Sequence, residues 1–124
     1  MIQYTHNKLN NTLNDKIQAH KFSSWLNHKG WKYYPYQIKV VEEYSKNQDI
    51  LVIAPTGAGK TIAGFLPSIL DVSSNNRSIL HTLYISPLKS LAYDIERNLR
   101  IPFKDSKINI TLDVRTGDTS AYKK

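Results

Sequence analysis

The chain has 124 residues, about the size of one small domain, and its hydrophobic fraction of 40% and charged fraction of 22% are ordinary for a globular protein. It has no cysteine, which excludes disulfides and thiolate metal sites. It also has no apolar run near the roughly 20 residues that cross a bilayer, and residues 1–14 lack the apolar stretch of a secretory signal, so the cytoplasm is the expected location. The net charge of +7 favours a polyanionic partner, because neutralising phosphates releases counterions.

A polar, flexible lead-in is predicted at residues 1–15, followed by two helices. Residues 16–29 carry apolar side chains at helical spacing, and Gly30 follows as a C-terminal stop. Pro35 suits the first turn of a second helix, because its fixed φ angle is already helical and its missing N–H is not needed there. Residues 16–48 are therefore predicted to form an N-terminal helical segment.

The rest of the chain alternates between strand and helix patterns. Apolar runs at residues 49–54 and 78–85 predict buried strands, and the alternation at residues 108–114 predicts a half-covered strand. Helical spacing lies between them, at residues 60–70 and 86–100. This order predicts an α/β fold, in which a parallel sheet with flanking helices follows the two N-terminal helices. Ligands of such sheets bind beyond the carboxyl ends of the strands.

A phosphate-binding loop directly follows the first predicted strand. The sequence A-P-T-G-A-G-K-T fits the pattern (A/G)-x-x-x-x-G-K-(S/T), which a chain of this length matches by chance on the order of once in a hundred. Its residues are the candidate nucleotide ligands, namely Ala54, Pro55, Thr56, Gly57, Ala58, Gly59, Lys60 and Thr61. The glycines let several N–H groups converge on an anion at the positive end of the next helix. As candidate catalytic residues, Lys60 contacts the β and γ phosphates of ATP and Thr61 coordinates Mg²⁺.

Three further motifs accompany this loop in the right order. They are G-W…P-Y-Q ending at Gln37, Y-I-S-P-L-K-S-L-A at residues 84–92 and V-R-T-G-D-T at residues 114–119. Together they resemble the early motifs of DEAD/DEAH-type superfamily 2 helicases, and the last two phrases are most similar to Lhr-type (large helicase-related) DNA helicases. The resemblance covers about residues 22–122, and it implies that residues 49–124 form an incomplete RecA-like ATP-binding domain.

The same resemblance implies residue roles. Gln37 corresponds to the Q-motif glutamine, which reads the adenine edge with an amide that can both donate and accept. The two downstream motifs imply contacts to a nucleic-acid backbone, which carry no sequence information and suit a translocating motor. The residues concerned are Ser86, Pro87, Leu88, Lys89, Arg115, Thr116, Gly117, Asp118 and Thr119.

Plainer interpretations of the same residues remain open. Gln37 is on a helix, where most polar side chains are merely solvated. Ser86 and Pro87 make a good helix start, and Asp118 can cap a helix. The tryptophans and the tyrosines at positions 33, 34 and 36 could stack on bases, although packing is the simpler expectation. The four histidines show no metal-ligand spacing.

No D-E-x-H sequence occurs in the chain, and a second lobe with arginine fingers is also missing. Phosphoryl transfer needs several such groups, so we expect a fragment of a larger helicase that binds ATP and hydrolyses it negligibly on its own. The intact parent is expected to couple ATP hydrolysis to movement along nucleic acid, with DNA favoured over RNA and a role in DNA repair implied by the family. Two alternatives are another P-loop NTPase and a non-catalytic nucleic-acid-binding module.

Overall fold

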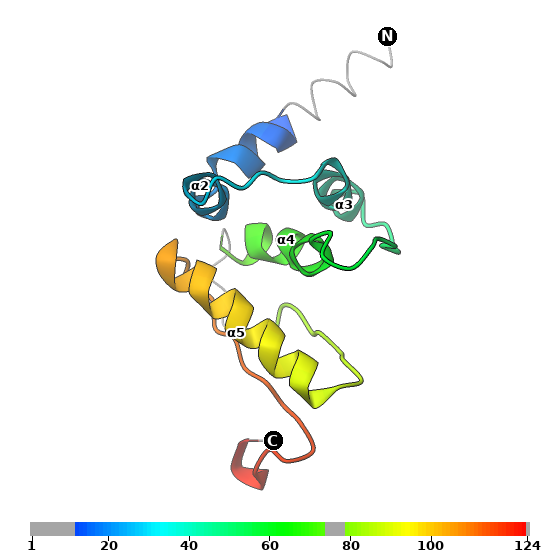
Figure 1. The fold of residues 1–124 in the computed structure, drawn as a ribbon, viewed down its shortest axis with the longest axis vertical. Helices are drawn as coiled ribbons and strands as arrows, with labels where there is room; N and C mark the ends of the chain where they lie inside the picture. The colour runs from blue at the N-terminus through cyan, green and yellow to red at the C-terminus, as the bar shows by residue number, and fades with distance from the viewer. Residues whose placement is uncertain (1–11, 74–78, 124) are drawn as a thin grey trace.

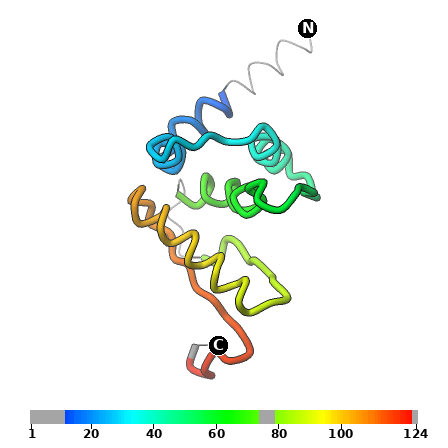
Figure 2. Tube along the Cα trace, viewed as in Figure 1, coloured from blue at the N-terminus to red at the C-terminus, as the bar shows by residue number. Residues whose placement is uncertain are grey.

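The computed structural model describes residues 12–73 and 79–123, and regular structure in them is helical. Residues 12–19 are helical, so part of the expected lead-in belongs to a helix, while residues 1–11 lie outside the described range. The named elements are α2 (Lys21–His28), α3 (Pro35–Ser45), α4 (Lys60–Val72), α5 (Lys89–Asp105) and the short 3-10 helix η1 (Ala121–Lys123). Figures 1 and 2 show α4 in the middle of the molecule, with α2 and α3 on one side of it and α5 on the other.

Local signals explain where these helices begin. Tyr34 is extended and Pro35 occupies the first turn of α3, as the sequence predicts. Gly59 precedes α4 with a left-handed φ of 79°, a conformation that costs little only for glycine. The single helix predicted at residues 16–29 is wrong, because His20 is extended and its ring nitrogen accepts a hydrogen bond from the Phe22 amide at 3.1 Å. That cap starts α2 as a separate helix.

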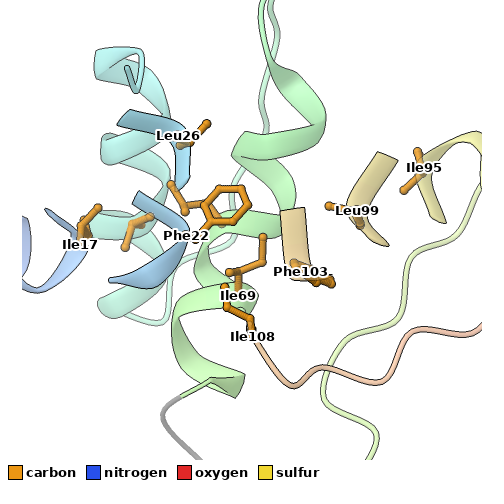
Figure 3. Packing of buried hydrophobic residues seen from close by; sticks show 10 residues of the cluster. Ile17, Phe22, Leu26, Ile69, Ile95, Leu99, Phe103 and Ile108 are labelled. Atoms are coloured by element: carbon orange, nitrogen blue, oxygen red, sulfur yellow. The ribbon is translucent and has the colours of Figure 1, made fainter. Parts of the chain in front are cut away.

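One apolar cluster holds the helices together. It contains Ile17, Phe22, Leu26, Val41, Leu66, Ile69, Ile95, Leu99, Phe103 and Ile108. Phe22 and Leu66 are fully buried, and burying a side chain of this size stabilises a fold by roughly 1.5–3 kcal/mol. Figure 3 shows Phe22 of α2 directed toward α4, where Ile69 lies. A hydrogen bond from the Trp25 indole to the Asp105 carboxylate, at 3.2 Å, also joins α2 to α5.

The predicted α/β fold, with a RecA-like parallel sheet, is wrong for this structure. No strand or sheet occurs in residues 12–73 and 79–123. The described parts of the three expected strands are not helical, but no backbone hydrogen bond joins one of them to another. Leu51 and Ile53 remain 85% and 87% exposed, so the first apolar run is not a buried strand.

The third expected strand has the predicted alternation of buried and exposed side chains but no neighbouring strand among the described residues. Ile108 is buried, Ile110 and Leu112 are partly buried, and the polar residues between them are exposed, so the alternation does report a one-sided segment. The covered side packs against the cluster that includes α5, and Arg100 of α5 donates to the Leu112 carbonyl at 3.0 Å. Period-two alternation predicts which side chains are buried, whereas a strand also needs a backbone partner.

In the part of the chain that the structure describes, no helix is long and apolar enough to cross a membrane.

Candidate nucleotide site and nucleic-acid interface

The predicted phosphate loop links α3 to α4 and contains two left-handed residues. Gly57 has a φ of 78° and Gly59 a φ of 79°, and the Ala58 amide closes a turn onto the Pro55 carbonyl at 3.2 Å. Thr56 and Gly57 are exposed at the tip of the loop. Alternation of ordinary and left-handed residues is the backbone arrangement in which amides form a concave anion-binding nest.

The first residues of α4 carry the charged and hydroxyl groups of the loop. Lys60 and Thr61 are both exposed, and no side chain caps the start of this helix. The first-turn amides of a helix have no intrahelical acceptor, and they lie at the positive end of the helix dipole. This end of α4 is therefore suited to an anion.

Lys60 folds back over the loop. Its ammonium group donates to the carbonyl of Ala54, the first residue of the motif, at 2.6 Å. An ammonium has three donors, so this bond fixes the position of the charge and leaves donors for a ligand. The bond therefore holds the lysine charge beside the first residue of the loop.

Gln37 is buried and lies against the loop. It is 4% exposed, its amide nitrogen donates to the Gly59 carbonyl at 3.0 Å, and its amide oxygen accepts from the Tyr34 amide at 2.8 Å. Both ends of the carboxamide are thus engaged with protein. Its contact with adenine stays a prediction, since the structure places it beside the loop and bonded to the backbone.

Tyr36 is a loop contact that the sequence did not indicate. Its hydroxyl donates to the Ala58 carbonyl, and its ring stacks on Tyr34 with centroids 6.1 Å apart. Partial burial, and then the neighbouring Tyr34, raise the pKa of Tyr36, which favours the protonated hydroxyl that donates this bond. The sequence favours packing for Tyr36, and no local pattern reveals its contact with a carbonyl 22 positions away.

The residues present fit a magnesium-bound triphosphate. The loop passes so close to α3 that only glycine fits at position 59, because a Cβ there would lie 2.6 Å from the Gln37 amide nitrogen. The uncapped start of α4, Lys60 and the Thr61 hydroxyl are of the chemistry that phosphates and Mg²⁺ require. Within the described residues, no cluster of three or more His, Cys, Asp or Glu side chains could hold a metal by itself.

The two predicted nucleic-acid segments meet at one ion pair. Lys89, the first residue of α5, lies 2.7 Å from the Asp118 carboxylate, and both side chains are exposed. Ser86 makes a local turn by accepting from the Leu88 amide at 3.4 Å, and Pro87 and Leu88 are exposed beside it. The sequence predicted that this helix begins at Ser86, but α5 begins three residues later, at Lys89.

The second segment, residues 115–119, is a compact turn. The Thr119 hydroxyl accepts from the Thr116 amide at 2.8 Å, and the Thr119 amide donates to the Thr116 carbonyl at 3.1 Å. Gly117 is exposed at its tip, and Arg115 pairs with Asp113. Figure 1 shows this turn near the C-terminal end, away from the phosphate loop beside α3, so the structure does not bring the two candidate sites together.

Comparison with known proteins gives consistent matches. Residues 34–124 match the family described as "DEAD/DEAH box helicase". The chain is 35% identical over 115 residues to the "ATP-dependent helicase Lhr-Core" of Methanocaldococcus jannaschii, covering 81% of the chain and 14% of that protein. It is 31% identical over 137 aligned positions to "ATP-dependent helicase Lhr-Core protein 2" of Thermococcus barophilus, covering 98% and 15%.

A more distant relative is the "ATP-dependent DNA helicase MER3" of Saccharomyces cerevisiae, which is 32% identical over 79 residues, covering 62% of the chain and 6% of that protein. The chain thus spans about one seventh of the length of the Lhr-Core proteins that it resembles. No solved structure gives a significant match.

Proposed function

The chain belongs to the DEAD/DEAH box helicase family, and on that premise we propose that it is the ATP-binding part of an ATP-dependent DNA helicase. The observation that carries this proposal is the loop at residues 54–61, with two left-handed glycines leading into an uncapped helix start that bears a lysine. The similarity to Lhr-Core helicases supports the same activity for the parent protein.

In this proposal each part of the loop acts on the triphosphate. The backbone amides around Gly57 and Gly59 bind phosphate oxygens, and the Lys60 ammonium neutralises the β and γ phosphates with the donors that its bond to the Ala54 carbonyl leaves unused. Thr61 offers a hydroxyl to Mg²⁺, which when bound neutralises charge on the phosphates. Gln37 lies next to the loop on α3, where it would contact the adenine edge with the N–H and the lone pair that its two backbone bonds leave unused.

The exposed start of α5 and the turn at residues 115–119 are proposed to hold a nucleic-acid backbone. Lys89 and Arg115 supply positive charge there, while the small polar residues around them supply amides and hydroxyls. DNA is favoured because the relative in Saccharomyces cerevisiae is named as a DNA helicase.

The 124-residue chain is proposed to bind ATP and to hydrolyse it negligibly, since no D-E-x-H sequence is present to position the attacking water. Clear DNA-stimulated hydrolysis by the purified chain that disappears in Lys60→Ala would contradict this part of the proposal.

Two lysines at helix starts give a matched test. Titration of the fluorescent analogue mant-ATP with Mg²⁺ should show that Lys60→Ala lowers affinity at least about tenfold, because a charge-assisted hydrogen bond contributes roughly 1.5–3 kcal/mol. Lys89→Ala, which removes the same charge from the start of α5, should leave mant-ATP binding unchanged. It should instead weaken binding of single-stranded DNA and lower the salt dependence by about one counterion. Equal mant-ATP affinity of the wild-type protein and Lys60→Ala would refute the nucleotide site.

A further inference from the structure

Two neighbouring side chains of α3 bind two neighbouring carbonyls of the phosphate loop. Tyr36 donates to the Ala58 carbonyl, and Gln37 donates to the Gly59 carbonyl at 3.0 Å. The Gln37 carboxamide is itself fixed, because its oxygen accepts from the Tyr34 amide at 2.8 Å. Helix α3 also packs along α4, so these bonds join the loop to a helix that is itself packed in the fold.

Peptide geometry converts these two bonds into an orientation of amides. The carbonyl of Ala58 shares a peptide plane with the amide of Gly59, and the carbonyl of Gly59 shares one with the amide of Lys60. The described chain has no cis peptide bond, and in a planar trans peptide the N–H points opposite to the C=O. Carbonyls held toward α3 therefore turn the amides of Gly59 and Lys60 away from α3, toward the open side of the loop.

We propose that the Tyr36 hydroxyl is a positioning group for phosphate binding, which acts through the Ala58 carbonyl to aim the Gly59 amide at the ligand. The inference rests on the proposed nucleotide-binding function and adds a residue outside the loop to that site. The Lys60 amide is oriented by the helix itself, because the Gly59 carbonyl also accepts from the Ala63 amide at 3.0 Å, the first bond of α4, to which the Gln37 bond is added. A left-handed glycine can rotate the peptide before it at little cost, so the bond from Tyr36 is what selects the orientation of the Ala58–Gly59 peptide.

The test uses Tyr36→Phe, which removes only the hydroxyl and keeps the ring that stacks on Tyr34. The ligand is inorganic tripolyphosphate with Mg²⁺, competing with mant-ATP, so that contacts to the base do not contribute. We expect Tyr36→Phe to lose affinity roughly fivefold, as for loss of one neutral hydrogen bond. Tyr44→Phe is the control, because it removes a hydroxyl from an exposed residue near the far end of the same helix.

A second measurement separates positioning from a general structural effect. In ligand-free protein, the ¹⁵N–¹H signal of Gly59 should shift in Tyr36→Phe, while core signals and the melting temperature remain as in the wild-type protein. Tripolyphosphate binding of Tyr36→Phe at wild-type affinity, with Lys60→Ala defective, would overturn the inference and leave the nucleotide site standing. Loss of affinity without movement of the Gly59 amide signal, or an equal loss in Tyr44→Phe, would overturn it as well. Failure of the wild-type protein to bind tripolyphosphate would instead refute the proposed function.

Discussion

Replacing Gly59 by alanine tests the contact between α3 and the phosphate loop most directly. The residue has a φ of 79°, and a left-handed conformation costs a residue with a side chain roughly 1–2 kcal/mol. The added Cβ would also lie 2.6 Å from the Gln37 amide nitrogen. That nitrogen belongs to a buried carboxamide that bonds to Gly59 and Tyr34, so it has little freedom to retreat.

Displacing the carboxamide leaves a buried polar group without a partner, which costs roughly a further 1–3 kcal/mol. We therefore expect Gly59→Ala to lower the free energy of unfolding by about 2–5 kcal/mol. Gly57→Ala is the matched control, since its φ is 78° and a Cβ there meets nothing within 4 Å. It should lower the free energy of unfolding by only about 1–2 kcal/mol.

Urea unfolding followed by far-ultraviolet circular dichroism measures both variants against the wild-type protein. The difference between the two alanine variants isolates the clash with Gln37, because the backbone term is common to both. Equal destabilisation in Gly57→Ala and Gly59→Ala would show that α3 does not bind the loop as the structure has it.

Two other predictions concern Tyr33 and the Lys89–Asp118 ion pair. Burial raises the pKa of Tyr33 to about 12, with the Ser23 hydrogen bond acting in the opposite direction, so its contribution to stability is complete below about pH 10 and is lost as the pH rises toward 12. Discounted for the partly exposed ring, the free energy of unfolding falls by about 1–2 kcal/mol over this range. Urea unfolding between pH 9 and 12 should show a smaller fall for Tyr33→Phe than for the wild-type protein, and an equal fall in both would contradict the raised pKa. Asp118→Asn should strengthen binding of single-stranded DNA about two- to fivefold at low salt, because it frees Lys89 and removes a repulsive charge. Weaker binding than in the control Asp94→Asn, measured by fluorescence anisotropy, would mean that the carboxylate holds the turn in its binding conformation.

Local signals in the sequence predicted the starts of α3 and α4 and the turn between them, but not the starts of α2 and α5. Pro35 begins α3, Gly30 ends the preceding helix with a φ of 74°, and Lys60 begins α4 directly after Gly59. These positions depend on the backbone preferences of one or two residues. The expected sheet depended instead on pairing between segments far apart in the chain, which apolar runs cannot specify.

The candidate site divides in the same way. The motif at residues 54–61 was readable because its chemistry is contained in eight consecutive positions. The contacts of Tyr36 and Gln37 with the loop join residues 22 positions apart, and the pair of Lys89 with Asp118 joins residues 29 positions apart. Such contacts follow from how α3 and α5 pack, so no local pattern reveals them.

The exposed apolar segments also govern how this protein behaves when it is concentrated. Leu51, Ile53, Leu80, Leu83 and Ile85 all lie on non-helical backbone at the surface, and such backbone is a ready template for another copy of the chain. The positive charge of the molecule opposes that encounter, but salt screens it over about 10 Å at 0.1 M. Aggregation should therefore increase as the ionic strength rises, and dilute samples at low ionic strength should remain monomeric.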